Sequence, residues 1–274
     1  MPKGTGEKKY PRPRRVPLDP HETEVVCLLE LEPHLLTSRA YICQDMGTLA
    51  VDIETASPEK EPSKQEHFRD TSYFELVAVA LGYKDGKETE TDVVLREGGW
   101  AQEHTARVIE SMLSWCEGRD IEKVITYNGN DFDLIHLRNW AQSLDQNRVS
   151  VDMSQRVDSL FTQHRDLAEL SFDKYRNRIS GDGTSFERIC KWENVNVIET
   201  KYVDYDLHES VHAEYGSKVE GWHIGESLGE MYVDLRVSGA TDTKTYRQLE
   251  QMLVDYATGD IIPLFELDLN FQSD

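Results

Sequence analysis

The segment 49–55, Leu-Ala-Val-Asp-Ile-Glu-Thr, constrains the fold most, because apolar and acidic residues alternate along it. Alternate side chains of a strand share a face, so the aliphatic residues point one way while Asp52 and Glu54 point the other. We therefore predict a strand over 48–54 with two neighbouring carboxylates on one face. Taken alone, such a pair also fits a solvated face of a sheet.

The periodicity along the rest of the chain predicts an α/β protein. Strands are expected over 75–83 and 91–95, joined through a turn at Asp85-Gly86, with a further short strand over 124–126. Apolar residues recur at helical spacing in four stretches: 100–115, 132–141, 185–192 and 243–256. Three initial strands followed by alternating strands and helices indicate a mixed β-sheet flanked by helices. The pattern over 195–240 predicts no definite structure.

Composition divides the chain into three parts. Residues 1–22 are rich in proline and basic residues and are expected to form a flexible arm. Residues 23–45 are expected to be an N-terminal extension packing on the domain formed by 46–270.

The longest apolar run is far shorter than a membrane span, and no apolar signal core is seen near the N-terminus. We therefore expect a cytoplasmic protein that makes no contact with membranes.

The formal net charge is −21, from 51 acidic and 30 basic residues. An acid excess spread over a whole chain resembles that of halophilic proteins, which work in a cytoplasm rich in potassium salt. At about 1 M salt the screening length falls to about 3 Å, so this charge does not exclude a nucleic-acid partner. The alternative is an ordinary acidic protein whose partner is not nucleic acid, and composition does not separate the two.

A second acidic segment follows the predicted strand 124–126. It reads Tyr-Asn-Gly-Asn-Asp-Phe-Asp over 127–133 and opens a predicted helix, which is where α/β proteins place their sites. Asp133 is the stronger candidate for a site residue, and Asp131 is an additional acid beside it. Both also fit the simpler role of acids that complement the dipole at a helix N-terminus.

A third segment, Tyr-Ala-Thr-Gly-Asp over 256–260, places an acid on the apolar side of a predicted helix. Asp260 shares a stripe with residues that favour burial: Leu249, Leu253, Tyr256 and Leu264. A buried carboxylate costs several kcal/mol unless a cation or hydrogen bonds meet it, so such an acid suggests a ligand. The alternative is an acid at a frayed helix end near Gly259 and Pro263.

Together the three segments resemble a known family. VDIET, YNGNDFD and YATGD have the order and broad spacing of the three motifs of DEDDy 3′–5′ exonucleases, which read D-I-E-T, N-x-x-x-F-D and Y-x-x-x-D. They are most similar to the proofreading exonuclease domain of family B DNA polymerases and its free-standing relatives. The resemblance covers about residues 46–268 and is loose over 195–240. Because no polymerase palm or fingers sequence is seen, a stand-alone form is expected.

The resemblance implies a ribonuclease H-like fold and a set of site residues. The implied ligands of two divalent cations, Mg²⁺ or Mn²⁺, are Asp52, Glu54, Asp133 and Asp260. Tyr256 would join these four as a catalytic residue by orienting the attacking water. Three further residues are candidates for substrate binding: Thr55, Asn128 and Phe132.

The function implied is a metal-dependent 3′–5′ exonuclease that removes nucleotides from single-stranded ends, with DNA favoured over RNA as the substrate. DNA repair or replication is the expected setting, with replication or repair proteins as further partners. One alternative is a 3′–5′ exoribonuclease, since no residue pattern identifies the sugar. Another is a non-catalytic ribonuclease H-like module that binds nucleic acid or a replication protein.

Overall fold

The computed structural model of the chain describes residues 47–86, 88–179, 185–207, 211 and 214–273. The predicted arm 1–22 and extension 23–45 lie outside these residues. Within the described part of the chain, no helix combines the length and the apolar character needed to cross a membrane.

A five-stranded mixed sheet forms the centre of the described region, with the strand order β3-β2-β1-β4-β5. The strands are β1 (Gly47–Ala56), β2 (Glu75–Asp85), β3 (Glu88–Leu95), β4 (Ile121–Thr126) and β5 (His164–Asp166). Strands β1, β2 and β3 pair antiparallel, whereas β4 is parallel to both β1 and β5. The predicted α/β class with a mixed, ribonuclease H-like sheet is therefore confirmed, and β1 lies at the middle of the sheet.

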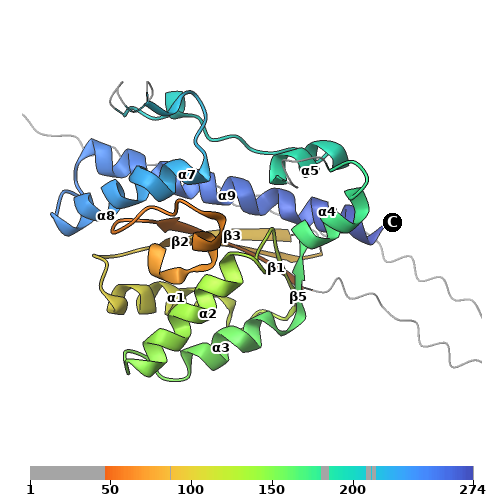
Figure 1. Cartoon of the computed structure of the whole chain (residues 1–274), viewed down its shortest axis with the longest axis horizontal. Coiled ribbons are helices and arrows are strands. Elements are labelled where there is room, and N and C mark those ends of the chain that lie inside the picture. The colour runs from red at the N-terminus through yellow and green to blue at the C-terminus, as the bar shows by residue number, and fades with distance from the viewer. Residues whose placement is uncertain (1–46, 87, 180–184, 208–210, 212–213, 274) are drawn as a thin grey trace, which may run out of the picture. The chain divides into compact units, whose positions relative to one another are not determined.

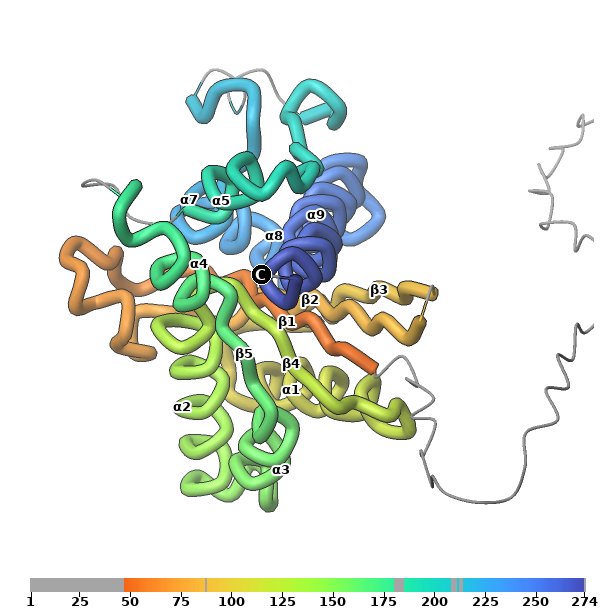
Figure 2. Tube along the Cα trace, turned by 90° about the vertical axis from the view of Figure 1, so that its right-hand side faces the viewer, coloured from red at the N-terminus to blue at the C-terminus, as the bar shows by residue number. Residues whose placement is uncertain are grey.

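Helices cover both faces of this sheet (Figures 1 and 2). One face carries α1 (Gln102–Cys116), α2 (Asp133–Gln146) and α3 (Met153–Leu160). The other face carries α4 (Leu167–Tyr175), α5 (Phe186–Glu193), α8 (Gly229–Val237) and α9 (Lys244–Gln272). Short segments complete the described elements: η1 (Gln65–Arg69), η2 (Thr71–Tyr73), η3 (Phe161–Gln163), η4 (Tyr202–Asp204), α7 (Gly221–His223) and the π-helical η5 (Ile224–Leu228).

The alternation along β1 divides its side chains between two cores. Leu49, Val51 and Ile53 are buried in the core beneath α1, α2 and α3. Ala50 is buried on the opposite face, in the core that includes α9. The period of two therefore sends Asp52 and Glu54 toward the α9 side of the sheet, as the strand pattern predicts.

Helix α9 is longer than its apolar pattern predicts. Its N-cap is Thr243, whose hydroxyl accepts a hydrogen bond from the backbone N–H of Tyr246 at 3.2 Å. The helix continues through Pro263 to Gln272. Asp260 therefore lies in a helix interior, and the alternative of a frayed helix end is wrong.

Helices α3 and α4 and strand β5 were not expected from the sequence, and the cause is clearest for α3. Asp152 at its N-cap position has left-handed backbone angles and makes no side-chain cap. The cap comes instead from Asp145 of α2, which accepts hydrogen bonds from the backbone N–H groups of Met153 and Ser154 at 3.0 and 2.8 Å. A cap supplied by another helix leaves no local signal at the start of α3.

Replacing Asp145 with alanine is expected to destabilise the protein by about 1–2 kcal/mol, because the cap of α3 is lost. Partial burial raises the pKa of Asp145, but hydrogen bonds from Ser154, Ser150 and Met153 outweigh it and hold the pKa at about 2. The stabilisation that ionised Asp145 gives the folded state is thus complete above the unfolded-state pKa of about 4, and it is lost as the pH falls through about 2.

Urea unfolding of the wild type and the Asp145→Ala variant across this pH range checks the expectation. The exposed acid Asp173 on α4 supplies a control. Its alanine variant is expected to stay within about 0.5 kcal/mol of the wild type. A difference between Asp145→Ala and the wild type that persists undiminished near pH 2 would contradict the proposed cap.

Candidate metal centre

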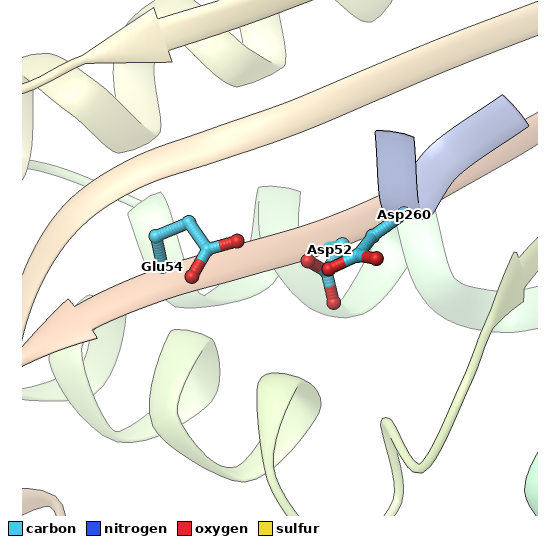
Figure 3. A group of neighbouring side chains, drawn as sticks. All are labelled: Asp52, Glu54 and Asp260. Atoms are coloured by element: carbon cyan, nitrogen blue, oxygen red, sulfur yellow. The ribbon is translucent and has the colours of Figure 1, made fainter. Parts of the chain in front are cut away.

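Three carboxylates that are distant in sequence meet on the α9 side of the sheet. One oxygen atom from each of Asp52, Glu54 and Asp260 lies within 4.8 Å of the other two. Figure 3 shows the first two on strand β1 and the third on helix α9. This group of three, called the acidic cluster below, could hold a metal ion.

Glu54 is the most deeply buried member of the acidic cluster. Its side chain is 5% exposed, and its Oε1 atom has no hydrogen-bond partner among the described residues. A buried carboxylate oxygen without a partner is unfavourable unless a cation or an ordered water meets it. This orphaned atom fits a bound cation, and three hard oxygen donors suit Mg²⁺ or Mn²⁺.

Asp133, the first residue of α2, adjoins the cluster but is not one of its members. Its side chain is 3% exposed, and its Oδ1 atom accepts a hydrogen bond from the backbone N–H of Ile53 at 3.0 Å. Its carboxyl group lies beside that of Asp52, close enough for each group to affect the pKa of the other. Asp133 is therefore attached to β1 directly beside the first carboxylate of the cluster.

The same burial shifts the pKa values of all four carboxyl groups upward. Burial raises the pKa of Asp52 well above its ordinary value, and the neighbouring charges of Asp133, Glu54 and Asp260 add to the rise. Burial also raises the pKa of Glu54, with repulsion from Asp260 and then Asp133 as further causes. Two unit charges about 4 Å apart repel by about 4 kcal/mol at an effective dielectric of 20. A divalent cation would remove this repulsion.

Hydrogen bonds moderate the shift in the other two groups. Burial raises the pKa of Asp133 to about 7, against the opposing effect of its backbone hydrogen bonds. Burial raises the pKa of Asp260 to about 6, opposed by a hydrogen bond from Tyr256 and by the charge of Lys218. Asp133 and Asp260 therefore ionise more readily than burial alone would allow.

Tyr256 lies one helical turn before Asp260, and its hydroxyl shares a hydrogen bond with the Asp260 carboxylate. Burial, followed by the charges of Glu54, Asp260 and Asp52, raises its pKa far above the ordinary value. The phenol therefore stays protonated and acts as a hydrogen-bond donor beside the acidic cluster.

Asp131, the additional acid of the second motif, has a different environment from Asp133. It is exposed and forms an ion pair with Arg69 of η1. Asp133 is turned instead toward Ile53 of β1. Asp131 and Asp133 therefore have different surroundings, and of the two only Asp133 adjoins the acidic cluster.

A residue that the motifs do not reveal, Asp166, holds the loop before α2. Its carboxylate accepts hydrogen bonds from the backbone N–H groups of Asn128 and Asn130 at 2.9 and 2.8 Å. It also caps α4 through the N–H of Ala168. Asn128 has a left-handed φ of 66°, so this loop needs such external support. The sequence at 166–169 could have suggested a helix cap, but not the loop that the same side chain binds.

A cavity of about 360 Å³ opens beside the acidic cluster. Its lining residues are Asp52, Ile53, Glu54, Thr55, Ser57, Glu61, Pro62, Phe68, Phe74, Phe132, Gly221, Trp222, Gly225, Glu226, Tyr256 and Asp260. Of the three predicted substrate-binding residues, Thr55 and Phe132 line this cavity. Asn128 lines a separate cavity together with Asp131 and Asp166. The assignment of a substrate-binding role to all three stays a prediction.

The wall formed by η5 is a π-helix, which is rare and is often found at functional sites. Gly225 and Glu226 of this segment line the cavity. The backbone carbonyl of Gly225 accepts a hydrogen bond from the N–H of Ser57 at 2.9 Å. This bond ties the wall directly to the chain that leaves β1.

The fold and the acidic cluster together define an α/β protein with a carboxylate site on the central strand of a ribonuclease H-like sheet. No model of a known protein family matches the chain, and no curated protein matches its sequence.

Solved structures that are similar to this chain include the following two. One is the family B DNA polymerase from the hyperthermophilic archaeon Pyrobaculum calidifontis, with 19% identity, a TM-score of 0.49 and coverage of 82% of this chain and 24% of that one. The other is an ExoI/SSB-Ct complex, with 13% identity, a TM-score of 0.32 and coverage of 76% of this chain and 43% of that one. This chain thus corresponds to less than half of either protein. Both likenesses are distant, so the function proposed below rests on the site itself.

Adding Mn²⁺ is expected to raise the thermal midpoint of the wild-type protein, because a ligand that binds the folded state alone stabilises it. The free energy of unfolding rises by about 2.7 kcal/mol when the ion is at 100 times its dissociation constant. Asp52→Asn should lose most of this gain, while Asp131→Asn serves as the control and should keep it. Differential scanning calorimetry with and without the ion checks the result. Equal gains in the two variants would place the ion elsewhere.

Proposed function

We propose that this chain is a metal-dependent 3′–5′ exonuclease that shortens single-stranded DNA ends. The observation that carries the proposal is the gathering of Asp52, Glu54 and Asp260 beside an open cavity, with Asp133 held next to them by the N–H of Ile53. Carboxylates clustered in a partly buried site are costly to the fold, so a catalytic use of cations explains them. The order of the three sequence motifs supports the same activity.

The carboxylates would hold two divalent cations, Mg²⁺ or Mn²⁺, and Asp52 would serve as a ligand of both. Cations held in this way supply an activated water and stabilise the leaving oxygen of a phosphodiester. Glu54 and Asp260 would bind one of the ions, and Asp133 would support the other while its Oδ1 atom keeps the hydrogen bond from the N–H of Ile53. The Tyr256 hydroxyl, already hydrogen-bonded to Asp260, would orient the attacking water.

Thr55 and Phe132 line the cavity and are proposed to contact the terminal nucleotide. The domain that carries the activity is proposed to extend over residues 46–270. Replication or repair proteins are its proposed further partners.

Nucleotide-by-nucleotide shortening from the 3′ end is expected when a 5′-labelled single strand is incubated with the protein and Mn²⁺. Asp52→Asn is expected to lower kcat by at least about 10³-fold, because it removes the ligand proposed to contact both ions. Asp131→Asn, an acid outside the cluster, is the control and should keep its activity. Full activity in Asp52→Asn would remove the proposed site.

Parallel reactions with DNA and RNA strands of the same sequence test the sugar preference. DNA is expected to be the better substrate, and a preference for RNA would make the protein an exoribonuclease. If neither strand is shortened but both bind, the chain is a binding module and the exonuclease proposal fails.

Tyr256→Phe is expected to lower kcat by about 10²-fold with little change in KM, because it removes the hydroxyl oxygen that would accept a hydrogen bond from the attacking water. Tyr205→Phe is a matched control, since the hydroxyl of Tyr205 donates to Asp255 of the same helix at 2.6 Å, outside the cavity. Steady-state kinetics of both variants provide the measurement. An equal loss in the two variants would point to general damage to α9 rather than to catalysis.

A further inference from the structure

The cavity beside the acidic cluster carries charge of one sign only. Five of its lining residues are acids: Asp52, Glu54, Glu61, Glu226 and Asp260. Among the described residues that line it, none is lysine, arginine or histidine. Most proteins that bind nucleic acid pair phosphates with such cations and release counterions. A strand that enters this cavity must be gripped in another way.

Two of the exposed aromatic side chains of the described region open onto this cavity. Phe68 of η1 is 45% exposed and Trp222 of α7 is 50% exposed, and both belong to the cavity lining. They come from segments more than 150 residues apart in the sequence, so the fold brings them to one site. Exposed aromatic rings beside a cavity are typical of binding surfaces.

Trp222 is fixed in position although half of its surface is exposed. Its indole N–H donates to Oε2 of Glu220 at 3.0 Å. Its ring packs edge-on against His223, with centroids 4.0 Å apart, and against Tyr215, with centroids 5.7 Å apart. The ring is therefore held in place before any ligand arrives, which lowers the entropy lost on binding.

Phe68 is also supported from beneath. Its backbone carbonyl accepts a hydrogen bond from Nε2 of the buried His136 at 3.0 Å, and Nδ1 of the same ring contacts the Thr71 hydroxyl at 2.8 Å. The Phe68 ring packs on Phe74 with centroids 6.0 Å apart. His136 thus anchors η1 to α2 and holds Phe68 at the cavity.

We propose that Phe68 and Trp222 are base-stacking platforms that grip the 3′-terminal bases of a single strand. Every base has a π-face, so stacking holds strands of any sequence and needs no cationic side chain. The strand would then be bound through its bases and through the metal ions, and not through ion pairs with its phosphates. The inference rests on the proposed exonuclease function and names how that site selects single strands.

Kinetics of Phe68→Leu and Trp222→Leu test the platforms. Each variant is expected to raise KM for a single strand by about 5- to 100-fold with kcat changed less than about threefold, since a stacked base is lost while the acids stay in place. Phe172→Leu is the matched control, because Phe172 is 55% exposed on α4 and lies outside this cavity. Unchanged KM in both test variants would overturn the proposal.

A strand whose last nucleotides lack bases separates stacking from a general loss of structure. The wild type is expected to bind this strand about as weakly as the Trp222→Leu variant binds a normal one. The Trp222→Leu variant should show a smaller difference in affinity between the normal strand and the strand without terminal bases than the wild type does. An equal penalty for missing bases in both proteins would show that Trp222 does not stack on them.

Salt provides an independent readout at fixed Mn²⁺. Between roughly 0.05 and 0.2 M salt, a protein with six to ten phosphate contacts loses about 10³- to 10⁵-fold in affinity. The wild type is expected to change its KM by less than about threefold over this range. A steep rise in KM would show that cations outside the cavity hold the phosphates, and would overturn the proposed mode of binding.

Failure of this inference is distinguishable from failure of the proposed function. If the wild type shortens strands and neither leucine variant changes KM, the exonuclease proposal stands and the stacking proposal fails. If the wild type shortens no strand, fluorescence anisotropy of a labelled strand replaces KM. Loss of that binding in the two leucine variants supports the platforms, and unchanged binding overturns them.

Discussion

The packing of α9 across the sheet is the constraint on which the site depends, because it brings Asp260 to the carboxylates of β1. Close approach requires Gly82 of β2, since a Cβ atom there would lie 2.5 Å from Ile261 and 2.9 Å from Phe265. Farther along the helix, the buried Asp268 pairs with Lys123 at 2.5 Å and with Arg165 at 3.2 Å, which attaches α9 to β4 and β5.

This packing forces like charges together, and the surrounding structure limits the cost. The N–H of Ile53 and the hydroxyl of Tyr256 each donate to a carboxylate, and both hydrogen bonds favour ionisation. Glu54 retains an unpartnered oxygen, so the protein alone does not satisfy the group. A cation bound by these carboxylates would meet this oxygen and reduce the repulsion among the four acids.

Support for the site comes from residues outside the three motifs. Asp166 holds the loop that leads to Asp133, and His136 holds the cavity wall that carries Phe68. No local pattern reveals either of these supporting roles, because each acts through backbone groups that are distant in sequence. The acidic cluster is therefore framed by ordinary polar contacts between loops and helices.

The sequence by itself determined the class of fold and the two faces of β1, because periods of 2.0 and 3.6 residues are local properties. It also placed Asp52 and Glu54 on one side of β1 and Asp260 on the apolar side of a helix, again from spacing alone. Only the tertiary structure decided that these acids meet, that α3 forms under a cap from Asp145, and that Phe68 and Trp222 share a cavity. Those outcomes depend on contacts between segments far apart in the chain. A local sequence pattern does not indicate which distant segments make the most favourable contacts.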